Sequence, residues 1–107
     1  MPPIQAGIEI RPLALRDIRE TTVWLDENAG ATIALRYFDA VQATLEMLAG
    51  NVMIGSPCGY SRQSLAALRR WPVKGFERWL VFYLPAKQGI DVARVLHGAR
   101  NLDEIFD

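Results

Sequence analysis

Residues 68–100 read LRRWPVKGFERWLVFYLPAKQGIDVARVLHGAR, and this stretch contains three segments with the composition of β-strands. The expected strands are 67–73, 78–84 and 90–97, which are rich in the β-branched and aromatic residues that favour strands. Pro72 marks the first as an edge or an end, because proline cannot donate a hydrogen bond to a neighbouring strand. The second segment is apolar on both faces, which predicts a central strand covered on one side by helices.

Two helices are expected ahead of these strands. Apolar residues recur at helical spacing from 13 to 25 and again across 31–49. The break between them falls at 28–30, where Asn and Gly tolerate the left-handed backbone that ends helices. Because the link is short, the two helices are predicted to form an antiparallel hairpin.

The remaining segments complete one domain that spans residues 1–107. Residues 8–10 alternate between apolar and polar side chains, which predicts a short first strand. Residues 51–65 carry Gly and Pro and are expected to form an irregular connection, and 102–106 a short C-terminal turn. The predicted order is β-α-α-β-β-β. The expected class is therefore α+β, with a helical hairpin packed on a small, mostly antiparallel sheet.

Charge is unevenly distributed along the chain, although the net formal charge at pH 7 is zero. Residues 62–100 contain eight Lys and Arg against two Asp and Glu, whereas residues 1–61 contain four against seven. Residues 101–107 add three more acids. This asymmetry points to an anionic partner of one of three kinds: nucleic acid, a nucleoprotein machine or an acidic protein segment.

The sequence contains no motif for metal or cofactor chemistry. Cys58 and His97 are the only residues of their types and lie far apart, without clustered carboxylates. The chain also lacks a P-loop, a dinucleotide fingerprint and a nucleophile elbow. We therefore expect no metal site, no cofactor and no nucleophilic triad.

The expected location of the protein is the cytoplasm. Its N-terminal residues lack the basic and apolar regions of a signal peptide, and its longest apolar run, 79–86, is too short to span a bilayer. The lone Cys58 leaves no intrachain disulfide and fits a reducing compartment. No association with a membrane is predicted.

Several arginines of the basic half are candidates for contact with an anion, because guanidinium groups fit phosphates and carboxylates. Arg69 and Arg70 are neighbours in a strand and must point to opposite faces, so they cannot form one patch. The charge count does not identify the target, and direct contact with nucleic acid stays open.

His97 has two interpretations. It ends a strand, precedes Gly98 and lies between Arg94 and Arg100. As a functional residue it would be an acid or base beside a bound phosphate, with the arginines stabilising the anion. As a structural residue it would hydrogen-bond a neighbouring backbone group, and this is the interpretation that we favour.

The aromatic residues of the strands are interpreted mainly as core, although such side chains also serve as stacking platforms for bases. Replacing Trp79 or Phe82 by alanine is then expected to cost about 3–5 kcal/mol of stability. Helical spacing further places Trp24 near Tyr37 or Phe38 in the hairpin.

Five segments together resemble one known family. They are ALRDI at 14–18, LAGN at 48–51, LRRWPV at 68–73, LVFY at 80–83 and RVLHGAR at 94–100. This ordered set is similar to the ParE branch of the RelE/ParE toxin superfamily, the toxins of bacterial type II toxin–antitoxin modules. Val52 departs from the pattern, since many relatives have proline after the Asn. The β-α-α-β-β-β order is also the order of that superfamily.

The resemblance implies one of two activities. RelE-like members resemble ribosome-dependent mRNA endonucleases, for which Arg94 and His97 would be the catalytic residues here. However, Gly98 follows His97 where several nuclease relatives carry tyrosine, and the neutral chain has only two lysines. ParE-like members instead poison DNA gyrase without catalysing a reaction. We therefore expect a non-enzymatic gyrase inhibitor.

The resemblance also implies a partner, a ParD-like antitoxin with an acidic tail that neutralises the toxin in a hetero-oligomer. Contacts to the antitoxin or target are expected from five residues: Arg70, Arg78, Arg94, His97 and Arg100. Charge reversal at Arg94 is expected to weaken binding with little effect on thermal stability. A third alternative is a binding module that has lost toxicity and only titrates an antitoxin.

Overall fold

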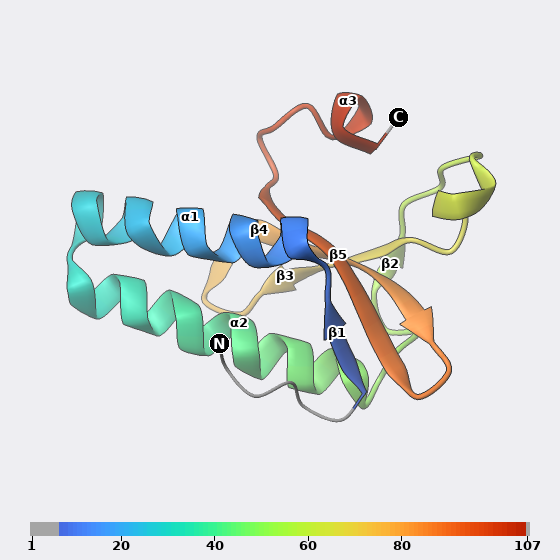
Figure 1. Cartoon of the computed structure of the whole chain (residues 1–107), viewed down its shortest axis with the longest axis horizontal. Coiled ribbons are helices and arrows are strands. Elements are labelled where there is room, and N and C mark those ends of the chain that lie inside the picture. Colours follow the sequence, from blue (N-terminus) through green and yellow to red (C-terminus); the bar gives the residue numbers. More distant parts are fainter. Residues whose placement is uncertain (1–6, 107) are drawn as a thin grey trace.

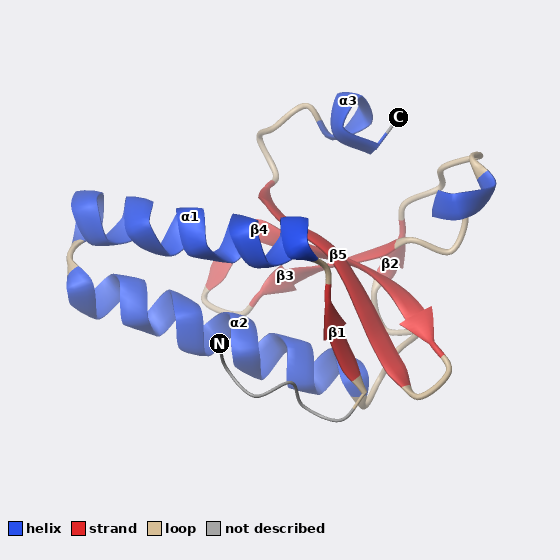
Figure 2. Ribbon diagram, viewed as in Figure 1, coloured by secondary structure: helices blue, strands red, loops and turns tan. Residues whose placement is uncertain are grey.

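The protein is built on a five-stranded sheet with a helical hairpin on one face (Figures 1 and 2). The structure is a computed structural model that describes residues 7–106. Its elements in chain order are β1 (Ile8–Ile10), α1 (Pro12–Ala29), α2 (Ala31–Ala49), β2 (Ser56–Pro57), the 3-10 helix η1 (Gln63–Leu65), β3 (Arg69–Val73), β4 (Phe76–Ala86), β5 (Gly89–His97) and α3 (Leu102–Phe106).

The strands lie in the order β1-β5-β4-β3-β2. β1 pairs parallel to β5, and every other pair is antiparallel, which confirms the α+β class and the mostly antiparallel sheet. Gly89 permits the close approach of β1, because a Cβ atom there would lie 1.8 Å from the carbonyl oxygen of Gly7. The sequence did not predict β2, a two-residue strand within the connection expected to be irregular.

The helical hairpin forms as predicted, and Gly30 joins its two helices. Gly30 has φ +95°, a left-handed value that glycine adopts without strain, and its amide donates a hydrogen bond to the Asp26 carbonyl. Pro12 occupies the first turn of α1, where its missing N–H and fixed φ do no harm. The main core lies between this hairpin and the sheet, and its largest buried side chains include Tyr37, Tyr83 and Leu48.

The other face of the sheet has a core of its own. Phe82 is only 1 % exposed and packs against Phe106 of α3, with the two ring centroids 4.8 Å apart. The buried residues of this second core are Leu68, Phe82, Ala93, Leu96 and Phe106. The prediction that β4 is a central strand with two apolar faces is confirmed. Helices of the hairpin cover one face, and α3 with the 58–68 segment covers the other.

Tyr83 anchors the connection between α2 and β3. Its hydroxyl accepts a hydrogen bond from the Gly55 amide and donates one to the Val52 carbonyl, both at 2.9 Å. A Cβ atom at Gly55 would lie 2.5 Å from that hydroxyl, so only glycine fits beside the ring. Arg69 also donates to the carbonyl oxygens of Met53 and Gly55. These contacts hold the loop against the sheet edge, where β2 pairs with β3.

Within the part of the chain that the structure describes, neither long helix combines the length and apolar character needed to cross a membrane.

Candidate functional site

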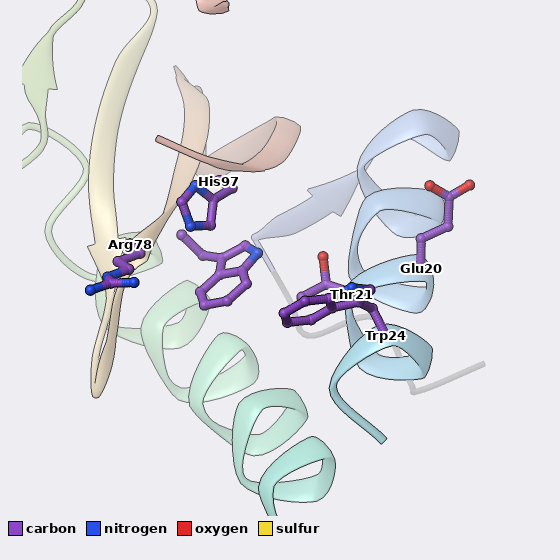
Figure 3. A pocket seen from close by; sticks show the side chains of 6 residues that line it. Glu20, Thr21, Trp24, Arg78 and His97 are labelled. Atoms are coloured by element: carbon purple, nitrogen blue, oxygen red, sulfur yellow. The ribbon is translucent and has the colours of Figure 1, made fainter. Parts of the chain in front are cut away.

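The hairpin extends beyond the sheet, and an open cleft of about 510 Å³ lies where α1 faces the beginning of β4 and the end of β5 (Figures 1 and 3). Its lining residues are Glu20, Thr21 and Trp24 from α1, Arg78 and Trp79 from β4, and His97 from β5. Figure 3 shows Thr21 and Trp24 facing the strands that carry Arg78 and His97. The cleft therefore joins one helix to two paired strands.

Trp79 is the fixed aromatic side of this cleft. Its ring contacts Tyr37 at a centroid distance of 5.8 Å and Phe76 at 6.5 Å, both edge to face. Trp24 lies 6.5 Å from Trp79 and is 55 % exposed. The prediction that Trp24 packs near Tyr37 or Phe38 was therefore wrong in its partner. Trp24 projects from α1 toward the end of the sheet, not between the two helices.

His97 is oriented by its own turn. Its Nδ1 accepts a hydrogen bond from the Ala99 amide at 3.0 Å, and its ring meets Trp79 edge to face at 4.9 Å. Because Nδ1 is the acceptor, the neutral imidazole carries its hydrogen on Nε2. The backbone hydrogen bond expected of His97 is thus present, and the ring also lines the cleft with a donor available.

Arg78 supplies the cation of the cleft. It is exposed, and its guanidinium forms no salt bridge within residues 7–106. Glu20 on the opposite rim is already paired, since its carboxylate accepts a hydrogen bond from Arg16 at 2.7 Å. Figure 3 shows that carboxylate directed away from Trp24 and His97. The cleft therefore presents an unpaired positive charge next to aromatic rings.

Arg94 forms an ion pair that the sequence did not predict. Its Nε and Nη2 donate to the two carboxylate oxygens of Asp17 at 2.8 and 2.9 Å, and these hydrogen bonds raise the pKa of Arg94. Asp17 is only 8 % exposed and also accepts the Val95 amide at 3.1 Å. β1 is too short to pair with this part of β5, so the amide lies at the open edge of the sheet. Asp17 supplies the hydrogen-bond acceptor that a longer β1 would provide.

A β-bulge separates Arg94 from the cleft. Phe82 pairs with Arg94 but Tyr83 pairs with Val92, which leaves Ala93 as the extra residue of β5. Arg94 is thus the cross-strand partner of Phe82 in the second core, whereas His97 is the partner of Trp79 on the hairpin side. Side chains three apart in a strand belong to opposite faces. Arg94 and His97 therefore do not meet at one site.

The other two candidate arginines are exposed and also lie outside the cleft. Arg70 pairs with Phe82 across β3 and β4, and Arg69 with Tyr83, which confirms that the two neighbours point to opposite faces. Arg100 follows β5, and its amide donates to the His97 carbonyl. Of the five predicted contact residues, the structure brings only Arg78 and His97 together.

The described residues contain no group of three or more His, Cys, Asp or Glu side chains that could hold a metal ion. Cys58 is partly buried beside the second core, and burial raises the pKa of its thiol, with Arg70 acting in the opposite direction. A thiol of raised pKa is a poor nucleophile. The chemistry of the cleft is therefore that of aromatic, imidazole and guanidinium groups.

Tyr37, which supports Trp79, should make the protein sensitive to alkali. Burial raises the pKa of Tyr37 to about 12, with Thr21 opposing the shift, whereas an unfolded tyrosine titrates near 10. Between these values the unfolded state loses the proton first, so stability should fall by about 1.4 kcal/mol per pH unit. Tyr37→Phe should make this slope shallower in chemical unfolding at pH 9 to 12 while leaving stability below pH 10 nearly unchanged, and Tyr83, whose pKa burial also raises, should account for part of the slope that remains. An equal slope in both proteins would contradict the assignment.

Three residues of the cleft were not predicted from the sequence as site residues. Glu20 and Thr21 lie in the predicted first helix but carried no predicted role, and Trp24 was expected to pack within the hairpin. Asp17 was missed as the partner of Arg94. Helical spacing could have grouped these residues. Asp17, Thr21 and Trp24 lie three or four residues apart and so share one side of α1.

The chain is similar to one known family and to a solved structure. The family described as ParE toxin of type II toxin-antitoxin system, parDE, matches residues 8–102. A solved structure, described as a chromosomal ParDE TA system from P. aeruginosa, has the same fold with a TM-score of 0.70 at 13 % sequence identity. The match covers 85 % of this chain and 94 % of that chain. No curated protein sequence matches the chain. Because the family match spans most of its length, the chain belongs to the ParE toxin family of type II toxin–antitoxin systems.

Proposed function

We propose that this protein inhibits DNA gyrase and is neutralised by a ParD-like antitoxin in a hetero-oligomer. The observation that carries the proposal is the family match over residues 8–102, to ParE toxins of parDE modules. The solved ParDE structure, with its shared fold, adds support for an antitoxin partner. The protein then acts by binding and catalyses no reaction itself.

The positions of Arg94 and His97 favour binding over RNA cleavage. A nuclease needs a base or acid and a cation at the same phosphate. Here the Arg94 guanidinium is held by Asp17, and His97 belongs to the opposite face of β5. Nδ1 of His97 is also occupied by the Ala99 amide. Two of the groups that cleavage would require are thus engaged in the fold.

The activity is tested with purified protein and two targets. Supercoiling by gyrase should stop, or cleaved DNA should accumulate, when the protein is added, and ribosome-bound mRNA should remain intact. Cleavage of that mRNA with gyrase unaffected would establish the nuclease alternative. Harmless accumulation of the protein, expressed alone at high level, would establish a module that only binds an antitoxin.

The antitoxin contact is expected at the exposed arginines of the basic half. Charge reversal at Arg70, Arg78 or Arg100 should weaken binding of a ParD-like antitoxin about tenfold, or about 1.4 kcal/mol, as measured by calorimetry. Arg36→Glu is the matched control, since Arg36 is exposed on α2 and outside the basic half. Equal affinity of all four variants would remove these arginines from the interface. Arg94 is unsuitable for this test because its ion pair supports the fold.

A further inference from the structure

We propose that the cleft between α1 and the β4–β5 pair binds one base of a single-stranded nucleic acid, stacked on its tryptophans, with the adjoining phosphate on Arg78. The proposal is independent of gyrase as the target. It rests on the cleft itself, whose residues come from three elements and surround a volume of about 510 Å³.

The two indoles offer a flat ligand two different surfaces. Trp79 is held in place by Tyr37, Phe76 and His97. Trp24 is more than half exposed, and its ring is tilted by 51° from Trp79 at a centroid distance of 6.5 Å. Exposing an indole to water is unfavourable, and a base that stacks on it removes apolar surface from both partners. Trp24 therefore presents the exposed stacking surface, and Trp79 backs it.

The polar groups of the cleft complement a nucleotide. Arg78 is exposed and has no carboxylate partner in residues 7–106, so its guanidinium is free to bind a phosphate. Nε2 of His97 is a hydrogen-bond donor, because Nδ1 accepts from the Ala99 amide. Bases carry ring nitrogens and carbonyl oxygens that accept such a hydrogen bond.

The arrangement of these groups favours a nucleotide over an acidic peptide. A nucleotide separates its neutral, flat base from its charge by a sugar. In Figure 3, Arg78 likewise extends along the strand side, away from Trp24. An acidic peptide would find only one unpaired cation in the cleft, and the Glu20 carboxylate at its rim. Two aromatic rings with a single cation match one base and one phosphate.

The test compares a labelled thymidine oligonucleotide with an abasic oligonucleotide of the same length, by fluorescence anisotropy. The wild-type protein should bind the thymidine strand roughly 5- to 150-fold more tightly, the range for stacking of one base. Trp24→Ala should abolish most of this difference, and Trp24→Phe should restore part of it. Val23→Ala is the matched control, because Val23 is equally exposed on α1 and does not line the cleft.

Arg78→Gln should act differently from Trp24→Ala. It should weaken binding of both oligonucleotides and lower the slope of log K against log salt by about 0.7, the value for one phosphate of a single strand. The ratio between the two strands should stay the same. Thermal melts near that of the wild type are expected for Trp24→Phe and Arg78→Gln, since both side chains are largely exposed.

Two results would overturn the proposal. One is equal affinity of the wild-type protein for the thymidine and abasic strands. The other is a polyglutamate peptide that displaces the thymidine strand and loses its own binding in Trp24→Ala, which would assign the cleft to acidic peptides. If the protein inhibits gyrase but shows no base-dependent binding, the nucleotide site is refuted and the proposed gyrase function stands. If it shows base-dependent binding but leaves gyrase unaffected, the gyrase function is refuted and the nucleotide site stands.

Discussion

Replacement of Arg94 by methionine should lower the free energy of unfolding by about 3–5 kcal/mol, the usual cost of removing one partner from a buried ion pair. The Asp17 carboxylate is 8 % exposed and would keep only the Val95 amide as a partner. Methionine retains much of the volume of the side chain, so lost packing contributes little. Urea unfolding followed by circular dichroism measures the effect.

The matched control is Arg11→Met. Arg11 pairs with Asp91 through the same two-pronged geometry, but the two side chains are 48 % and 26 % exposed. Such a pair contributes at most about 1 kcal/mol in water. If Arg94→Met costs no more than Arg11→Met, the Asp17 carboxylate is better hydrated than its burial indicates.

The double variant Asp17→Leu, Arg94→Met should recover part of the loss. No unpaired charge remains in it, although the Val95 amide still lacks its acceptor. The result bears on function as well, because it replaces the expectation that Arg94 can be changed without affecting thermal stability. Any loss of activity in an Arg94 variant therefore has to be compared with its loss of thermal stability.

Replacement of Phe82 by alanine should be similarly destabilising, by about 3–5 kcal/mol. Phe82 is 1 % exposed at the centre of the second core, and α3 rests on it through Phe106. The cavity cannot collapse easily, since Leu68 and Leu96 are held in the sheet and its flanking loop. Thermal unfolding reports the loss, and limited proteolysis of the 98–106 segment should show that α3 is released.

Leu35→Ala serves as the control for Phe82, because Leu35 is 64 % exposed on α2 and its loss should fall within about 0.5 kcal/mol. Trp79→Ala should cost less than Phe82→Ala, since Trp79 is only partly buried and one side of its ring faces the cleft. The sequence alone gave these two aromatics the same expected effect. A cost below about 1 kcal/mol for Phe82→Ala would show that the second core contributes little.

The second core explains why a short chain has two apolar faces on one strand. Side chains of β4 alternate between the hairpin side, with Val81 and Tyr83, and the α3 side, with Leu80 and Phe82. The sequence predicted helices on one side only, and a short turn at the C-terminal end. The turn is α3, and it gives the otherwise open face of the sheet its cover.

Element order and type were predictable because they depend on local patterns. The spacing of apolar residues in 13–25 and 31–49 indicated two helices, and both are present. The boundaries of the strands differ by two residues or fewer from those expected, and β5 begins one residue earlier, at Gly89. Two short elements, β2 and η1, were not predicted, since two or three residues carry too little periodicity. β2 depends on the loop contacts of Tyr83 and Arg69.

The sequence by itself determined the α+β class, the hairpin, the basic half and the opposite directions of Arg69 and Arg70, because each depends on residues close together in the chain. Only the tertiary structure decided which cations are free. Asp17 and Arg94 are 77 residues apart, and their ion pair depends on how α1 crosses the edge of β5. The cleft likewise exists because the hairpin extends beyond the sheet (Figure 1), which leaves Trp24 facing the strands that carry Trp79, Arg78 and His97.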